Sequence, residues 1–273
     1  MKYTQIGSLK VSKVCLGCMG FGDASQGMHS WTLPYEDSKK IIFHALGSGI
    51  NFFDTAMAYQ SGTSEEYLGR AIKEYGYRED VIIATKYTPK SDDSIDSRTY
   101  LRECLNNSLR RLQTDYIDLY IMHMWDYRTP IEDTLEILND FIKEGKIKEI
   151  GISMTPYSAL ASGRLAKHPG ETSQRLEKDT YAKGKYDASS DLDLKIIQRV
   201  EKLASKHHVS MSEVSLSWLM SKVASPVVGA TKLKHVDTAV LATELELSEE
   251  EKQYLEEPYQ PHPLVGVMAT NTK

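Results

Sequence analysis

Short apolar runs alternate along the chain with longer amphipathic stretches. The apolar runs cover residues 13–16, 50–54, 81–86, 117–123, 147–153 and 226–230. In the stretches between them apolar residues recur at helical spacing, as Leu101, Leu105 and Leu109 do. This alternation, with no Pro/Gly/Ser-rich linker, predicts α/β units joined by right-handed crossovers. We therefore expect residues 1–273 to form a single barrel domain around a parallel sheet.

Capping signals predict where the helices begin and end. Thr63 and Glu66 form a capping box that opens a helix, and Gly76 ends it after residue 75. Thr129 and Pro130 are the expected N-cap and first residue of a later helix that runs to Gly145. Further helices are expected at 36–46 and 97–112 and from near Ser190, Ser210 and Ser248. The long polar stretch 163–190 is expected to be a loop on the face of the barrel.

Composition narrows the class of protein. The chain has 41% hydrophobic and 26% charged residues, which supports a sizeable core. Its net charge of −5 and the lack of a Lys/Arg block give no indication of a nucleic acid or membrane partner. The first residues lack the apolar centre of a signal peptide, and there are three cysteines. We expect a cytoplasmic protein of unknown oligomeric state.

Polar residues stand at the ends of three apolar runs. Asp54, Lys86 and His123 each end a run, and Tyr59 follows Asp54 closely. The carboxyl ends of parallel strands meet at one rim, where strand–helix folds carry their chemistry. These residue types predict proton donation to a carbonyl oxygen and no metal site. A tyrosine pKa of about 10 is too high for donation near neutrality, and a lysine ammonium beside the phenol would lower it.

In this hypothesis each remaining group has its own task. Asp54 fixes Lys86 by an ion pair, and His123 orients the substrate oxygen. Two other hypotheses stay open: a lysine at a barrel strand end can also form a Schiff base, as in an aldolase, and the chain could bind a cofactor without turnover. Taken singly, the same residues could be a solvated strand end, a core histidine and a turn.

Two further motifs support no separate function. Cys15 and Cys18 form a Cys-x-x-Cys, but they lie in the expected first strand and no second pair accompanies them. Gly17, Gly20 and Gly22 follow that strand, but their spacing differs from the dinucleotide-binding fingerprint. They also open a loop and not a helix, which excludes a Rossmann site.

The candidate residues lie in motifs that resemble the aldo-keto reductase family. Residues 51–59 and 62–69 read NFFDTAMAY and GTSEEYLG, residues 84–86 read ATK, and residues 116–123 read YIDLYIMH. The stretch 138–147, LNDFIKEGKI, is similar to the family's approach to the fifth strand. The resemblance covers nearly the whole chain. It implies a (β/α)8 TIM barrel with an N-terminal hairpin at residues 1–14.

The resemblance also implies a cofactor and a reaction. The matching tetrad Asp54, Tyr59, Lys86 and His123 would be catalytic, with Tyr59 as general acid in the NADPH-dependent reduction of an aldehyde or ketone. The positive charge of Lys232 favours NADPH over NADH. Apart from the resemblance, Trp31 and Trp125 fall in expected rim loops, where they either line an apolar substrate pocket or pack on the surface. Cofactor contacts carry over to Gly17, Met19, Asp54, Ser153, Tyr157, Ser158, Leu160, Arg164, Thr231 and Lys232.

One departure from the family changes the expected fold. In the family roughly fifty residues separate the strand ending at Ser153 from the motif that begins at Thr155, and parallel neighbours need such a crossover. Here only Met154 lies between them. About two strand–helix units are therefore expected to be missing. Residues 147–160 would then form one fused or kinked extended segment, and the barrel would reclose or leave two open edges.

Overall fold

The computed structural model describes residues 1–90, 94–124, 130–152, 158–172, 180–186 and 190–261. Its centre is a six-stranded sheet in the order β7-β6-β5-β4-β3-β8, with every neighbouring pair parallel. The strands are β3 (Cys15–Gly17), β4 (Phe52–Asp54), β5 (Ile82–Tyr87), β6 (Ile117–Met122), β7 (Ile147–Ile152) and β8 (Val227–Gly229). The predicted α/β class and parallel order are confirmed.

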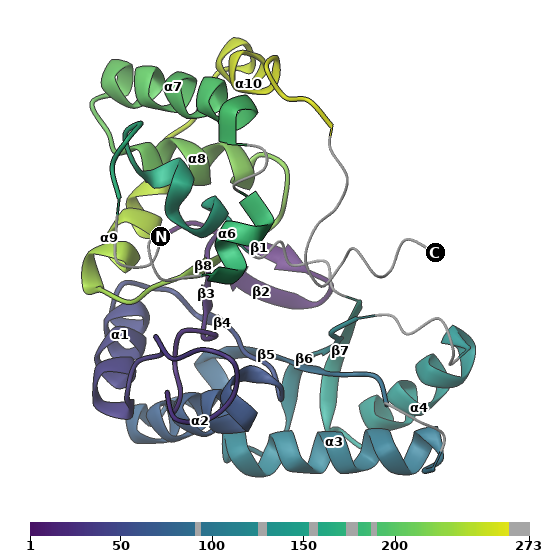
Figure 1. Ribbon diagram of the computed structural model, residues 1–273. Coiled ribbons are helices and arrows are strands. Elements are labelled where there is room, and N and C mark those ends of the chain that lie inside the picture. Colours follow the sequence, from purple (N-terminus) through teal and green to yellow (C-terminus); the bar gives the residue numbers. More distant parts are fainter. Residues whose placement is uncertain (91–93, 125–129, 153–157, 173–179, 187–189, 262–273) are drawn as a thin grey trace.

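Helices follow the strands and lie in two groups (Figure 1). The first group flanks the sheet and contains α1 (Tyr35–Gly47), α2 (Thr63–Tyr75), α3 (Ser97–Leu112) and α4 (Ile131–Lys143). The second gathers on the side of β8 and contains α6 (Thr180–Tyr186), α7 (Ser190–His207), α8 (Met211–Met220), α9 (Leu233–Ala242) and α10 (Glu249–Glu256). Short 3-10 turns are η1 (Tyr59–Gly62), η2 (Arg78–Asp80) and η3 (Ala161–Ala166).

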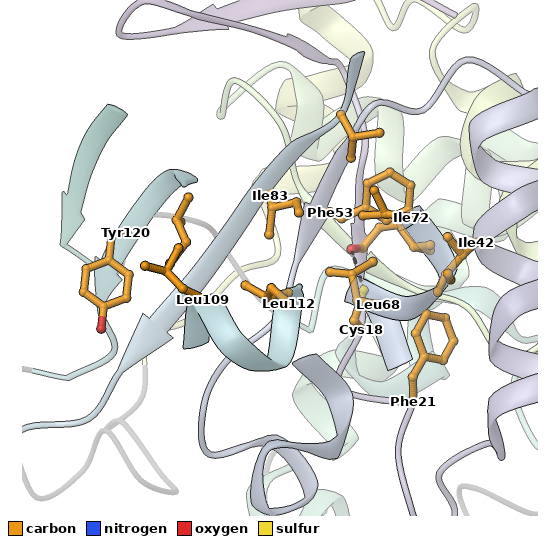
Figure 2. Close-up of a cluster of buried hydrophobic side chains, with 14 of the residues drawn as sticks. Cys18, Phe21, Ile42, Phe53, Leu68, Ile72, Ile83, Leu109, Leu112 and Tyr120 are labelled. Atoms are coloured by element: carbon orange, nitrogen blue, oxygen red, sulfur yellow. Dashed lines mark hydrogen bonds between the residues drawn. The ribbon is translucent and has the colours of Figure 1, made fainter. Parts of the chain in front are cut away.

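In β3, β4 and β5, neighbouring side chains along the strand pack into different cores. Figure 2 shows Phe53 and Ile83 on the face that packs against helices, near Leu68, Ile72 and Leu112. Their strand neighbours Phe52 and Ala84 belong to a second, inner cluster together with residues of β6 and β8. This division follows from the two-residue period of a strand.

An antiparallel hairpin closes the inner cluster. It consists of β1 (Tyr3–Ile6) and β2 (Leu9–Ser12), as expected from the resemblance. Leu9 and Val11 of β2 pack into the inner cluster. At the hairpin turn the Ser8 hydroxyl and backbone N–H both donate to Oε1 of Glu149 on β7, at 2.6 and 2.9 Å.

The caps were predicted with mixed success. Ser210 and Ser248 form complete capping boxes with Glu213 and Glu251, as expected. The box at Thr63 is wrong: Gly62 is the N-cap, and the Thr63 hydroxyl donates to the backbone oxygen of Gln60 at 2.8 Å. Helix α4 begins one residue after Pro130, and Thr129 lies outside the described residues.

Two expectations after β7 are also wrong. Residues 158–160 do not continue the strand, because Ser158 has a left-handed φ of 62° and begins a turn. The stretch 163–190 is not all loop, since it contains the end of η3 and the whole of α6. Helix α9 was not predicted at all. In the part of the chain that the structure describes, β7 and β8 are the two end strands of the sheet, which agrees with the expected number of about six units.

Candidate active site

The strand period brings three of the predicted polar residues to the same side of the sheet. Asp54 lies two residues beyond the inward-facing Phe52, and Lys86 lies two residues beyond Ala84. His123 stands in the same relation to Ile121. Because side chains of a strand alternate, each of these residues continues the inward-facing row at its carboxyl end. The sheet therefore assembles the group that the sequence indicated.

Lys86 is the centre of this group. Its Nζ donates to Oδ1 of Asp54 at 2.5 Å, to the backbone oxygen of Thr55 at 2.8 Å and to Oη of Tyr59 at 3.3 Å. An ammonium has three protons, so these contacts use its whole donor capacity. Lys86 and Asp54 are only 5% and 3% exposed. The expected ion pair is present and buried.

The electrostatics keep Lys86 charged. Burial acts to lower the pKa of the ammonium, but the Asp54 carboxylate and the Tyr59 hydroxyl outweigh it, and the pKa of Lys86 is held above its ordinary value. Contacts with a carboxylate and a carbonyl oxygen offset the cost of burying this charged lysine.

The pKa of Tyr59 departs from the sequence-based expectation. Burial raises it, Lys86 lowers it, and the net result is a pKa above the ordinary value. The effect of the ammonium has the expected sign, but desolvation of the phenolate is larger. Tyr59 is therefore protonated at neutral pH. Since its oxygen accepts a hydrogen bond from Lys86, its own proton is directed elsewhere.

His123 packs against the tyrosine. The two rings are 5.7 Å apart between centroids and meet edge to face at 80°. The backbone N–H of His123 donates to the backbone oxygen of Tyr87 at 2.9 Å, and the ring Nδ1 is buried without a hydrogen-bond partner among the described residues. Burial, and then the charge of Lys86, lower the pKa of His123 to about 4. The ring is neutral at physiological pH.

We expect the stability of the protein to report this titration. The folded pKa of His123 is about 4, below its ordinary 6.5, so the unfolded chain binds the proton more readily. The contribution of His123 to the free energy of unfolding is complete above pH 6.5 and decreases as the pH falls toward 4. A pH titration followed by proton NMR should give a midpoint near 4 for the imidazole resonance of His123. That resonance is identified by its absence from the His123→Asn variant. A midpoint near 6.5 would contradict the prediction.

Hydroxyl groups that sequence reasoning did not single out hold the rim together. The Thr55 and Ser64 hydroxyls are 2.9 Å apart, and Ser64 also donates to the backbone oxygen of Cys18 at 2.8 Å. On the outer side of the sheet Thr85 donates to the fully buried Glu65 at 2.6 Å. Both Ser64 and Glu65 belong to the motif GTSEEYLG, and membership in that motif was the sequence feature that could have identified them.

Two groups of residues were predicted to hold the two ends of the cofactor, and they lie at the carboxyl ends of the adjacent strands β3 and β8. Gly17 of β3 pairs with Asp54 on one side and with Gly229 of β8 on the other. Met19 is half-buried in the turn after β3. Beyond β8, Thr231 is half-buried, and the exposed Lys232 is the N-cap residue of α9.

The half-buried Trp31 lies close to Thr231, one of the residues that follow β8. A Cβ on Gly20 would be 3.4 Å from Cζ3 of Trp31 and 3.8 Å from Cγ2 of Thr231. Trp31 and Thr231 therefore both lie against the backbone of Gly20. The other predicted pocket residue, Trp125, lies outside the described residues, as do Ser153 and Tyr157.

The segment predicted to cover a pyrophosphate packs beside β8 and α9. Leu160 contacts the buried cluster that contains Val228 and Ala239. The Ser158 hydroxyl is 2.8 Å from that of Tyr186 at the end of α6. The guanidinium of Arg164 lies over the ring of the same tyrosine, 4.9 Å from its centroid. Contact with Tyr186 could not be foreseen, because α6 was expected to be loop.

Neither cysteine of the Cys-x-x-Cys has an open environment. Cys15 and Cys18 are fully buried, and burial raises the pKa of both thiols. The described residues contain no cluster of His, Cys, Asp and Glu that could hold a metal ion. Across the same residues, no helix has the length and apolar character that crossing a bilayer requires.

A parallel α/β sheet with a polar cluster at the carboxyl ends of its strands is the arrangement in which α/β enzymes, TIM barrels among them, carry their active sites. The sequence model of the aldo/keto reductase family matches residues 13–156 and 152–260, and the chain belongs to this family. It is therefore related to oxidoreductases that act on small carbonyl compounds.

Individual relatives agree with this assignment. The chain is 32% identical to versiconal hemiacetal acetate reductase of Aspergillus parasiticus, over 96% of this chain and 98% of that protein. It is 30% identical to a putative aryl-alcohol dehydrogenase of Schizosaccharomyces pombe, over 94% and 95%. Among solved structures, the holo form of aldo-keto reductase AKR11C1 from Bacillus halodurans has a TM-score of 0.72 and 26% identity, covering 95% of this chain and 97% of that one.

The same comparisons agree with the expected loss of a segment. The alignment with the Aspergillus reductase extends over 339 residues, although this chain has 273. The two family matches meet at residues 152–156, where the sequence lacks the usual crossover.

Proposed function

We propose that this protein reduces an aldehyde or ketone to an alcohol with NADPH, with Tyr59 as the general acid. The observation that carries the proposal is the buried Lys86, which contacts both the Asp54 carboxylate and the Tyr59 hydroxyl. That contact couples a proton donor to a fixed positive charge at the strand ends.

The chemistry of the described residues suits a nicotinamide dinucleotide phosphate. Lys232 is the N-cap of α9, and a helix N-terminus beside an exposed lysine suits a phosphate group. Arg164 lies in the segment that packs against the same region through Leu160. Gly17 and Met19 would hold the nicotinamide end beside Asp54. When bound, the nicotinamide supplies the hydride.

The chain's own residues would act on the carbonyl oxygen. Tyr59 holds a proton at neutral pH and would pass it to the oxygen as negative charge develops there. Lys86 would stabilise the phenolate that remains, because its ammonium lies 3.3 Å from Oη. Asp54 keeps the lysine charged and in place. The neutral His123, in contact with the tyrosine ring, would orient the oxygen by a hydrogen bond.

The same geometry disfavours a Schiff-base aldolase. An amine attacks a carbonyl only in its neutral form, whereas Lys86 is ion-paired and its pKa is raised. Borohydride treatment in the presence of an aldehyde should not attach the substrate to Lys86. Trapped adduct would reverse this preference.

A nicotinamide-binding protein without turnover is the second candidate. It is favoured by the interruption of the family match at residues 152–156, close to the expected nicotinamide contacts Ser153 and Tyr157. Saturable NADPH binding without consumption across many carbonyl compounds would support it. An aromatic aldehyde is the first substrate to try, because one relative is named as an aryl-alcohol dehydrogenase. The cytoplasmic location remains a prediction.

A charge-removal experiment tests the cofactor assignment. Lys232→Ala is expected to raise the Kd for NADPH by about tenfold, since one ion pair with a phosphate is lost, and to leave NADH binding unchanged. Nucleotide fluorescence titration measures both constants. Lys234→Ala is the matched control, because it removes a charge that is also exposed and lies two residues away, in the first turn of α9. Equal affinity of the Lys232 variant and wild type for NADPH would exclude this contact.

A further inference from the structure

Immediately after Tyr59 the backbone takes a conformation that L-residues disfavour. Gln60 has φ 47° and ψ 48°, and Ser61 has φ 55° and ψ 29°. Both lie in the left-handed region, where a side chain crowds its own backbone. Gln60 is nevertheless only 1% exposed, so a polar side chain is buried at a strained position next to the tyrosine.

The amide of Gln60 is buried because a loop surrounds it. This rim loop comprises residues 22–32, and its base is closed by a bridge between Phe21 and Leu33. Gln60 Nε2 donates to the backbone oxygens of Asp23 and His29, at 2.9 Å each. Nε2 also contacts the backbone oxygen of Gln26. Oε1 accepts from the backbone N–H of His29 at 3.0 Å.

Glycines of the rim loop allow this close approach. A Cβ on Gly27 would lie 2.7 Å from Cα of Gln60, and a Cβ on Gly22 would lie 2.8 Å from its Cβ. Both glycines also have positive φ values, 74° and 135°. Gly22 belongs to the glycine-rich motif that was unsuitable for a dinucleotide. Its backbone instead packs against the residue that follows Tyr59.

The rim loop is adjacent to the proposed active site at more than one point. Four residues before the loop begins, the backbone N–H of Cys18 donates to the backbone oxygen of Asp54 at 2.8 Å. Near its end, Trp31 lies against Gly20 together with Thr231. Gln60 supplies the contact in the middle, next to Tyr59.

We propose that Gln60 is a positioning residue that fastens the rim loop, with Trp31, to the segment bearing Tyr59 and thereby sets the affinity for the carbonyl substrate. This inference rests on the proposed function. Gln60 contacts the rim loop and not the reacting atoms, so its removal should weaken substrate binding more than turnover.

Two substitutions test the role from different sides. Gln60→Gly tolerates the left-handed φ but removes the amide. Gln60→Glu retains the length and one acceptor, but places a carboxyl oxygen where Nε2 faces backbone oxygens. The control is Ser61→Gly, because Ser61 is also left-handed but exposed. Both glycine variants relieve the same kind of backbone crowding, and only one removes the contacts with the rim loop.

Hydrogen exchange measures how firmly Gln60 holds the rim loop, and it does not depend on enzymatic activity. Residues 22–32 of Gln60→Gly are expected to exchange about tenfold faster than in wild type, because their opening no longer breaks the amide contacts. Ser61→Gly should leave this exchange unchanged. If Gln60→Gly exchanges at the wild-type rate, Gln60 does not fasten the rim loop and the proposal is wrong.

Steady-state kinetics measure the consequence. KM for an aromatic aldehyde should rise about tenfold in Gln60→Gly, with kcat within about twofold and the KM for NADPH unchanged. Gln60→Glu should share this defect at pH 8 and recover as the pH is lowered, because a protonated carboxyl regains one donor. Gln60→Gly should show no such recovery.

The outcomes separate this inference from the proposed function. If Gln60→Gly exchanged faster but had the same KM as Ser61→Gly, the link between the rim loop and substrate binding would be overturned. If kcat of Gln60→Gly fell about tenfold while its KM stayed unchanged, Gln60 would act in the chemical step instead. If wild type consumes no NADPH with any carbonyl compound, the proposed function and the link to substrate both fail. Hydrogen exchange then still decides whether Gln60 fastens the rim loop.

Discussion

Replacing Tyr59 by phenylalanine is expected to lower kcat for carbonyl reduction by about 100-fold to 10 000-fold, the usual contribution of a general acid. The ring would keep its edge-to-face contact with His123, so the shape of the site should change little. Only the hydroxyl that accepts from Lys86 is lost. The Kd for NADPH should therefore stay within about twofold of wild type, because loss of chemistry without loss of binding marks a group that acts in the transition state.

Tyr120→Phe provides the matched control. Tyr120 is fully buried on the helix-facing side of β6, and its hydroxyl has no hydrogen-bond partner among the described residues. Loss of this hydroxyl should leave kcat and the Kd for NADPH unchanged. Single-turnover measurements on both variants would separate chemistry from product release. Turnover by Tyr59→Phe at the rate of the control would eliminate Tyr59 as the proton donor.

Lys86→Met is expected to reduce both stability and turnover. Breaking one side of a buried ion pair costs about 3–5 kcal/mol in the free energy of unfolding, because Asp54 is left as an uncompensated buried charge. Turnover should fall by at least about 100-fold, since the phenolate of Tyr59 would lose its neighbouring charge. Denaturant unfolding at pH 7 measures the loss of stability. Steady-state kinetics at temperatures where the variant is folded measure the loss of turnover.

A second substitution distinguishes the charge effect from loss of packing. Asp54→Asn combined with Lys86→Met removes both charges and should recover part of the lost stability, because the pair is coupled. Activity should not return, since the double variant has no ammonium beside Tyr59. A double variant as unstable as the sum of its two single variants would show that the ion pair does not stabilise the fold as described.

The strand ends illustrate how much of the site the sequence could predict. Asp54, Lys86 and His123 each end an apolar run, and parallel strands bring such ends to one rim. The structure places them there, with the Lys86–Asp54 contact at 2.5 Å. Their roles in catalysis remain proposals. The contact between the hydroxyls of Ser158 and Tyr186 was not predicted, because residues 180–186 were expected to be loop and instead form α6.

Capping and burial show where local signals stop being sufficient. Ser210 and Ser248 cap their helices as the sequence predicts, because a capping box involves only neighbouring residues. The same signal at Thr63 is wrong, because its hydroxyl bonds to Gln60 and accepts from the backbone of Asp23, forty residues away. A contact across that distance along the chain leaves no local pattern.

The amino-acid sequence by itself determined the α/β class, most helix and strand positions, the group at the strand ends and the family, since these depend on periodicity and short motifs. Only the tertiary structure decided the raised pKa of Tyr59 and the lowered pKa of His123, because desolvation depends on what covers a group. It also decided that Gln60 lies inside the rim loop, since that burial depends on residues distant in the chain.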